Sequence, residues 1–169
     1  MMKDIYFAQA HQDDLATVLQ FLKEAALWLQ ERGIDYWQDW LHPPPLFLNW
    51  IQEGFDHDEF HLVYQSADVI GCFRLQWQDE LFWGPQTDNA GYIHSFTISR
   101  SLAGQHKGEQ VLALIEEHCR ARGKNFLRLD CGKSIHGLCQ YYEGYGFRKV
   151  GEITVMDEEM ALYEKSLVM

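Results

Sequence analysis

The segment from residue 92 to residue 131 constrains the fold of this chain more than any other. Tyr92 to Ser99 is an apolar run typical of a buried strand, and a turn containing Gly104 and Gly108 follows it. Residues 108–122 then repeat apolar side chains at three and four positions, which is the spacing of one helix face. Phe126 to Cys131 is a second strand candidate. This order of strand, turn, helix and strand predicts an α/β unit.

The rest of the chain predicts elements on both sides of this unit. Before it we expect a strand at 5–8, a helix from residue 13 to Gly33, a second helix at 46–53 introduced by Pro43 to Pro45, and paired strands at 59–65 and 69–78. After it we expect a helix over 135–142 and a strand pair at 147–155 and 159–166. No linker or repeat interrupts the 169 residues, so we expect a single domain, 1–169.

Composition excludes several protein classes. Residues of the AVILMFWYC set make up 47% of the chain, which is enough for a packed core. The longest apolar run, Ala25 to Leu29, is far shorter than the roughly 20 residues that span a bilayer, and the N-terminus lacks the apolar region of a signal peptide. Four cysteines without CxxC spacing predict reduced thiols. We therefore expect a cytoplasmic protein that binds no membrane.

The charge is unevenly distributed along the chain. The net charge of −11 opposes nucleic-acid binding. Residues 1–98 carry 4 basic and 15 acidic groups, residues 99–149 carry 9 and 5, and residues 150–169 carry 1 and 5. An anionic ligand could bind the basic third while the acidic remainder attracts a cation; an uneven solvated surface without function is equally compatible with these counts.

The turn before residue 108 has the features of a phosphate site. A helix that begins after a glycine-containing turn presents unpaired N–H groups and a partial positive charge. The candidate donors run from Gly104 to Glu109, although an ordinary turn would need the same glycines. A P-loop is excluded because Leu127 stands where the motif before Gly132 needs glycine, and no GxGxxG follows the first strand.

Taken in series, these pieces resemble the GCN5-related N-acetyltransferase (GNAT) superfamily over residues 90–150. The strand at 92–98 resembles the family's central strand, residues 103–108 (AGQHKG) lie where its pyrophosphate loop Q/R-x-x-G-x-G/A falls, and residues 141–147 (YYEGYGF) resemble its Y-x-x-x-G-F ending. The resemblance implies a mixed α/β (α+β) fold with a central mixed, largely antiparallel, twisted sheet, helices on both faces and a splayed central strand.

The sequence departs from the family pattern at three positions. The first Arg or Gln of the loop is Ala103, its middle Gly is His106, and the Asn common after the next strand is Ile135. His106 is either an exposed turn residue or a pH-dependent positive charge beside the phosphates.

The resemblance implies acetyl transfer from acetyl-CoA to an amine in a ternary complex, here the primary amine of a small cationic acceptor. The family's bulged strand carries over to Phe96, Thr97 and Ile98, whose backbone would pair with the pantetheine, with the Ile98 N–H as the donor to the carbonyl oxygen. The loop residues implied in cofactor binding are Ala103, Gly104, Gln105, His106, Lys107, Gly108 and Glu109.

One catalytic residue, a general acid, follows from the resemblance. Tyr142 matches the family's tyrosine general acid, and a phenol with a pKa of about 10 stays protonated at neutral pH. It also shares the apolar face of Leu138, so a core role is open, and Tyr141 serves as a control.

The general base is less defined. Glu80, Asp88, His94 and Asp130 are all available, and a chain of waters could serve if the amine is already partly neutral. His94 is the first choice because it lies on the central strand. A hydrogen-bonded structural histidine is the alternative. The pair His57 and His61 lacks the Glu that HExxH requires, so no metal is expected.

Aromatic residues of the opening helices resemble the wall of the family's acceptor site. Trp28, Tyr36, Trp37 and Trp40, beside Asp35 and Asp39, could hold an organic cation, or could simply pack. The alternative to an enzyme is a non-catalytic acyl-CoA-binding or metabolite-sensing module of the same fold. A purely structural domain and a homodimer are also left open.

Overall fold

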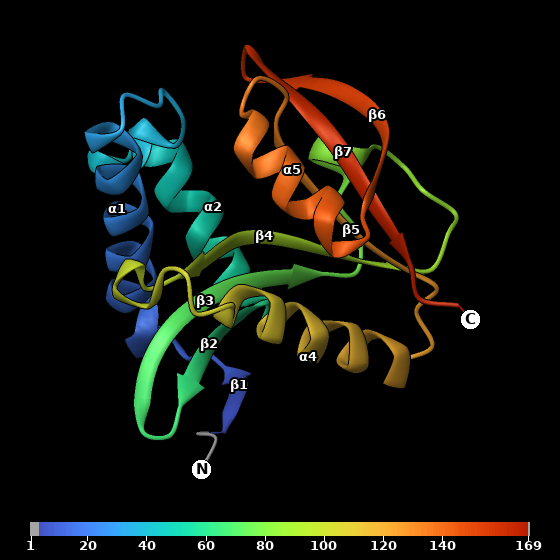
Figure 1. Ribbon diagram of the computed structural model, residues 1–169, viewed down its shortest axis with the longest axis horizontal. Coiled ribbons are helices and arrows are strands. Elements are labelled where there is room, and N and C mark those ends of the chain that lie inside the picture. The colour runs from blue at the N-terminus through green and yellow to red at the C-terminus, as the bar shows by residue number, and fades with distance from the viewer. Residues whose placement is uncertain (1–3, 169) are drawn as a thin grey trace. The chain divides into compact units, whose positions relative to one another are not determined.

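A computed structural model describes residues 4–168 of the protein (Figure 1). Its helices are α1 (Leu15–Glu31), α2 (Pro45–Asp56), α3 (Glu80–Trp83), α4 (Lys107–Ala121) and α5 (His136–Tyr145), with short 3-10 turns at Gln12–Asp14, Gln38–Leu41 and Arg100–Leu102. Its strands are β1 (Ile5–Gln9), β2 (Phe60–Gln65), β3 (Asp68–Gln76), β4 (Ala90–Ile98), β5 (Phe126–Gly132), β6 (Arg148–Val155) and β7 (Glu158–Ser166).

The strands of the described residues form one open sheet in the order β1-β2-β3-β4-β5-β7-β6. The pairs β1–β2, β2–β3, β5–β7 and β6–β7 are antiparallel, and β4–β5 is parallel. The helix α4 lies between these two parallel strands in the sequence, as expected of a strand-helix-strand unit. The predicted fold class, a mixed α/β protein with a largely antiparallel sheet, is therefore confirmed.

The periodic elements lie where the sequence predicts them, within a few residues at each end. Apolar spacing predicts α1, α4 and α5 because each buries one face. Gly33 and Gly146 follow the ends of α1 and α5 at φ of +69° and +109°, a region that favours glycine. The four-residue helix α3 is absent from the prediction, because one turn shows no periodicity.

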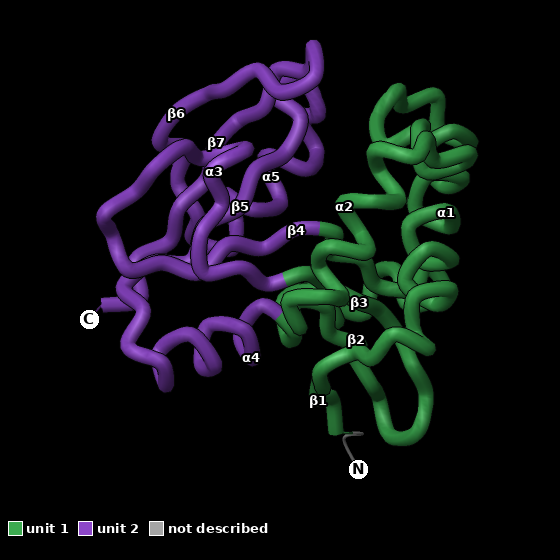
Figure 2. The backbone as a smooth tube through the Cα atoms, turned by 180° about the vertical axis from the view of Figure 1, so that it is seen from behind, with its two compact units in different colours: residues 1–74, 95–111 green, residues 75–94, 112–169 purple. Residues whose placement is uncertain are grey.

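The chain divides into two compact units, each built from separate stretches of sequence (Figure 2). Unit 1 comprises residues 1–74 and 95–111, and unit 2 comprises residues 75–94 and 112–169. The chain crosses between the units within β3, within β4 and within α4. The prediction of a single domain, 1–169, stays a prediction.

In unit 1, α1 and α2 lie side by side (Figure 1) and pack on β2 and β3. Arg74 is buried within this unit, and its guanidinium donates to Glu59 Oε1 at 2.7 Å and to the Trp50 carbonyl at 2.9 Å. The same guanidinium lies 4.2 Å from the Trp50 ring centroid. A buried charge that is paired and hydrogen-bonded in this way can be tolerated in a core. The buried residues that form the hydrophobic core of this unit are Ala10, Val18, Leu22, Ile51, Phe55, Phe60, Leu62 and Cys72.

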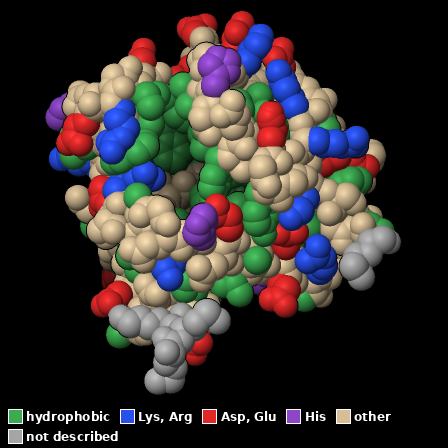
Figure 3. Space-filling model, viewed as in Figure 1, with side chains coloured by type: hydrophobic (Ala, Val, Ile, Leu, Met, Phe, Trp, Pro, Cys, Tyr) green, Lys and Arg blue, Asp and Glu red, His purple; other side chains and the backbone are tan. Residues whose placement is uncertain are grey.

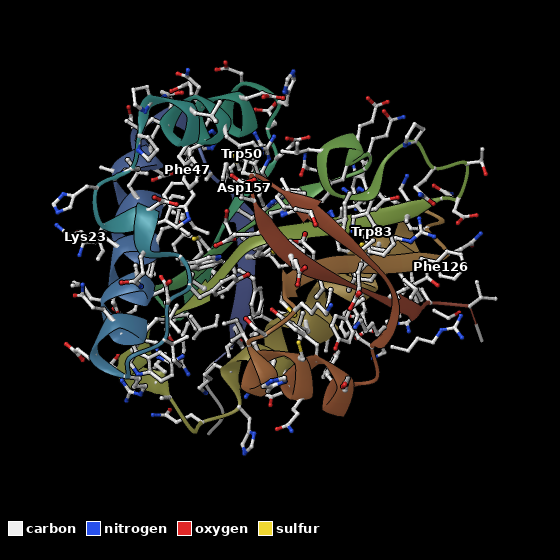
Figure 4. The ribbon with its side chains drawn as sticks, turned by 90° about the horizontal axis from the view of Figure 1, so that it is seen from above. Lys23, Phe47, Trp50, Trp83, Phe126 and Asp157 are labelled. Atoms are coloured by element: carbon white, nitrogen blue, oxygen red, sulfur yellow. The ribbon has the colours of Figure 1, made fainter. Side chains whose placement is uncertain are left out.

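In unit 2, a second buried arginine lies in an aromatic cage. Arg128 of β5 lies 5.1 Å from the ring of Trp83 and 5.0 Å from the ring of Phe126, both labelled in Figure 4. It donates to Asp88 Oδ2 at 2.6 Å and to Glu164 Oε2 at 2.8 Å. This network joins α3, β5 and β7.

More than half of the nine basic residues of the stretch 99–149 are paired with acidic side chains. At least five of them form ion pairs with acidic side chains: Arg120, Arg128, Lys133, Arg148 and Lys149. On the face seen in Figure 3, acidic and basic side chains are interspersed. The uneven charge along the sequence is thus partly cancelled by folding. Within residues 4–168, no helix has the length and apolar character needed to cross a bilayer.

Candidate active site

Strand β4 carries a bulge in its middle. Ser95 has φ of +54° inside the strand, a conformation that a regular strand does not contain. The parallel register pairs Ala90, Gly91 and Tyr92 with residues 126–128, although β4 continues to residue 98 and β5 to residue 132. The two strands therefore pair at their beginnings only, which is the splayed central strand that the resemblance implies.

Phe96, Thr97 and Ile98, the predicted pantetheine-binding residues, form the end of β4 in unit 1. The Thr97 hydroxyl lies 3.2 Å from Cys72 Sγ, and burial raises the pKa of that thiol to about 12. A Cβ at Gly71 of β3 would overlap the Thr97 carbonyl oxygen, so glycine is needed for this close approach. The Thr97 side chain lies in the core, so any ligand role of this residue falls to backbone groups that β3 does not use.

The predicted pyrophosphate loop is an exposed turn of unit 1. Ala103, Gly104, Gln105 and His106 are all exposed, and α4 begins at the next residue, Lys107. The φ angles of Gly104 and His106 are +80° and +58°. The turn thus keeps the left-handed conformation at the position where the family motif has glycine, with a histidine in its place.

The side chains on this turn and on the first turn of α4 include both signs of charge. His106 Nδ1 lies 3.6 Å from Glu109 Oε1, and the His106 side chain is 81% exposed. Lys107, Gly108 and Glu109 form the first turn of the helix, where backbone N–H groups have no partner within the helix itself. These are the groups that favour an anion.

A stack of two arginines on one indole connects the turn to α1. The guanidinium carbons of Arg32 and Arg100 lie 3.8 Å and 3.7 Å from the Trp28 ring centroid. Both guanidinium groups therefore lie within cation–π distance of the same indole ring. Glu24 Oε1 accepts the backbone N–H of Arg100 at 3.1 Å. Burial, and then the charge of Arg32, lower the pKa of Arg100.

The aromatic residues expected to line an acceptor site contact other side chains of the protein. Two arginines of the protein itself already lie over the Trp28 ring, which argues against a substrate cation at this residue. Trp40 packs with Phe47 at 5.2 Å, and Tyr36 is buried against Trp37 at 6.0 Å. Trp37 and Trp40 pack on the core of unit 1.

In unit 2, His94 lies between two buried carboxylates. Its Nε2 is 2.6 Å from Asp79 Oδ2, and its Nδ1 is 3.5 Å from Asp130 Oδ1. The three side chains are 9%, 4% and 5% exposed. Burial raises the pKa of Asp130 to about 6; the His94 charge lowers it and the Asp79 charge raises it.

These three residues offer donor atoms within 4.8 Å of one another, as a metal site would. However, each ring nitrogen faces a different carboxylate, and one ion can bind only one nitrogen of an imidazole. A 2.6 Å separation is that of a hydrogen bond. The arrangement fits a proton better than a metal ion.

Of the other candidate bases, Glu80 is exposed on α3, and Asp88 is paired with Arg128. Asp79 was not anticipated as a site residue. It precedes a helix of one turn, accepts the Phe82 N–H at 3.2 Å, and is followed five residues later by Gly84 at φ of +66°. An Asp in this position is a helix N-cap signal that the sequence does contain.

Tyr142, the predicted general acid, lies on α5 in unit 2 and is 7% exposed. Burial raises its pKa, and negative charge on Cys131, Tyr141 and Asp130 would raise it further. Its ring meets Phe147 edge-on at 5.8 Å. Tyr142 is thus a protonated phenol near Asp130 and also part of the core of unit 2.

The family model for the acetyltransferase (GNAT) family matches residues 20–147.

The chain belongs to the GNAT family. It is 27% identical over 155 residues to an uncharacterized N-acetyltransferase, YesJ, of Bacillus subtilis, covering 86% of this chain and 83% of that protein. Its fold is similar to a GNAT acetyltransferase of Listeria monocytogenes, with a TM-score of 0.77, 26% identity and coverage of 96% and 94%. It is also similar to the aminoglycoside acetyltransferase AAC(6')-Ib in complex with coenzyme A, with a TM-score of 0.72, 16% identity and coverage of 96% and 95%.

Proposed function

We propose that this GNAT protein is an acetyl-CoA-dependent N-acetyltransferase acting on the primary amine of a small cationic acceptor. The observation that carries the proposal is the bulged β4, which pairs with β5 over three residues only. Backbone groups beyond that point are free of the parallel ladder and suit an extended ligand with amide groups, as pantetheine is.

The cofactor part of the proposal rests on unit 1. The backbone of Phe96 to Ile98 would pair with the pantetheine, and the Ile98 N–H would donate to the thioester carbonyl oxygen. The exposed turn from Ala103 to His106 and the first turn of α4 would bind the pyrophosphate through backbone N–H groups. A Cβ at Gly104 would meet nothing within 4 Å, so no side chain of the protein covers this point of the turn.

The proton-transfer part rests on unit 2. Tyr142 would give a proton to the departing thiolate, because its raised pKa keeps the phenol protonated. His94, flanked by Asp79 and Asp130, would be involved in taking the proton that the amine loses.

A cationic acceptor is favoured by the charge of residues 1–98, which carry 15 acidic and only 4 basic groups.

A non-catalytic acyl-CoA-binding module is the second candidate. It is favoured by one specific observation: both ring nitrogens of His94 face buried carboxylates of the protein itself. Such a module would bind acetyl-CoA and acetylate no amine.

Cofactor binding and turnover are tested separately. Thermal unfolding with acetyl-CoA at about 100 times its dissociation constant should stabilise the native state by about 2.7 kcal/mol. Gly108→Glu should remove most of this stabilisation, because it adds bulk and negative charge at the turn. If acetyl-CoA causes no stabilisation at millimolar concentration, the transferase proposal fails.

Turnover is then measured by thiol release with a panel of diamines and polyamines. Tyr142→Phe should lower kcat with acetyl-CoA affinity unchanged, whereas Tyr141→Phe, one residue away on the same helix, should leave kcat unchanged. Binding of acetyl-CoA without acetylation of any amine would favour the non-catalytic module.

A further inference from the structure

Three side chains from three elements of unit 2 meet in its interior. Asp79 precedes α3, His94 lies on β4 and Asp130 lies on β5. The distances of 2.6 Å and 3.5 Å place the imidazole between the two carboxylates, one at each ring nitrogen. Two buried carboxylates on one imidazole are costly unless a positive charge or a proton compensates them.

Asp79 fixes the orientation of the His94 ring. Its Oδ1 accepts the Phe82 N–H at 3.2 Å, and its Oδ2 lies 2.6 Å from His94 Nε2. The Phe82 ring packs on the imidazole with a centroid distance of 4.7 Å. A carboxylate without a proton can only accept, so this short contact favours the tautomer in which Nε2 carries the proton. The other nitrogen, Nδ1, is thereby directed toward Asp130.

Asp130 lacks a hydrogen bond where one is expected. Its Oδ1 is buried with no hydrogen-bond partner, and the 3.5 Å separation from His94 Nδ1 is longer than a hydrogen bond. An unsatisfied carboxylate oxygen is expensive in a protein interior. One proton between Nδ1 and this oxygen would give the Asp130 oxygen a hydrogen-bond partner.

The surrounding ionisable groups do not supply that proton. The charges that act on the Asp130 pKa are those of His94 and Asp79. Cys131 beside it on β5 and Tyr142 on α5 have pKa values raised by burial, so both remain neutral at physiological pH. Cys139, also on α5, has its Sγ 3.6 Å from Cys131 Sγ, and Glu80 on α3 is exposed.

We propose that Asp79, His94 and Asp130 act as one proton-accepting group, in which Asp79 is the positioning residue and the accepted proton is shared between His94 Nδ1 and Asp130. The catalytic consequence rests on the proposed function. As the amine nitrogen bonds to the acetyl carbon and the C–S bond breaks, the amine proton passes to this group and the thiolate takes a proton from Tyr142. Water then removes the proton from the group and restores that of Tyr142.

Nitrogen-15 NMR of the histidine rings tests the group without any acceptor. The His94 signals are identified as those lost in His94→Gln. In the native protein, Nε2 should carry the proton, and the group should take up one further proton on Nδ1 as the pH falls. Asp130→Asn should move the midpoint of that step down by at least about one pH unit, because one of two flanking carboxylates is removed. Asp79→Asn should abolish the fixed Nε2–H tautomer.

Glu80→Gln is the matched control, since it removes an exposed carboxylate next to Asp79 and should change neither property. Thermal unfolding of each variant separates an altered ring from a misfolded protein. The proposal is overturned if the His94 tautomer and midpoint in Asp79→Asn and Asp130→Asn equal those in Glu80→Gln.

The pH profile of acetylation tests the catalytic consequence. With a turned-over amine, kcat/KM should rise with pH through the same midpoint, and Asp79→Asn should lower it about 100-fold with acetyl-CoA affinity unchanged. If NMR finds the shared proton but the native protein acetylates no amine, the proposed function fails and the proton-sharing group stands. If the native protein is active and Asp79→Asn matches Glu80→Gln, the group has no part in catalysis.

Discussion

Replacing Asp130 with Asn should make the protein more stable at pH 8. Burial raises the pKa of Asp130 from 3.8 to about 6, so the native state holds its proton more tightly than the unfolded chain does. Stability from such a group is present below the unfolded pKa and is lost as the pH rises through the folded pKa. Above pH 6 the ionised carboxyl therefore costs stability, and an amide of the same shape avoids that cost.

The magnitude follows from the size of the shift. The difference of about 2.2 units, 6 minus 3.8, corresponds to about 3 kcal/mol at 1.36 kcal/mol per unit. A buried amide also needs hydrogen-bond partners, so we expect a gain of about 1 to 3 kcal/mol. For a chain of this size, 1 kcal/mol shifts Tm by roughly 2–4 °C. At pH 5 the linkage relation leaves about half of the gain.

The assay is urea unfolding of the native protein and of Asp130→Asn at pH 5 and pH 8. Glu80→Gln is the control, because it removes an exposed carboxylate that lies next to Asp79 in the chain. An Asp130→Asn protein that is less stable than the native protein at pH 8, or whose advantage does not grow between pH 5 and pH 8, would refute the argument from burial.

Three further substitutions test other features. Gly71→Ala should destabilise the protein by about 1–3 kcal/mol in urea unfolding, because the added Cβ overlaps a backbone oxygen, whereas Gly137→Ala, which meets nothing within 4 Å, should cost nothing. His106→Gly should strengthen acetyl-CoA binding in titration calorimetry, since glycine adopts φ of +58° without strain; weaker binding would mean that the imidazole itself contacts the phosphates. Glu59→Ala should lower the free energy of unfolding by about 3 kcal/mol, because it leaves the buried Arg74 without its carboxylate, and an unchanged urea midpoint would contradict this.

Local patterns in the sequence predict much of this fold. The spacing of apolar residues at three and four positions predicts α1. Two apolar runs separated by a short turn predict the hairpin of β2 and β3. The turn before α4 is predicted because glycines mark it. These predictions are correct because each depends on residues that are close together in the sequence.

The candidate site is harder to predict, because its residues are distant in sequence. Asp79 and His94 are 15 residues apart, and their contact depends on α3, which is too short to show periodicity. The positive φ angles of Ser95 and His106 fall on residues other than glycine, so no local signal marks the conformation of these two residues. A partnership between two carboxylates and an imidazole can be found only once the chain has folded.

The arginine stack on Trp28 has a mechanical consequence for unit 1. Arg100 opens the segment that leads into the exposed turn, and both its guanidinium and its backbone N–H are held by α1, 76 residues earlier at Glu24. Restraining the turn therefore restrains the middle of α1 as well. A ligand bound at residues 103–109 should slow amide hydrogen exchange in α1 around Trp28, so that this helix reports on occupancy of a turn remote from it in the chain.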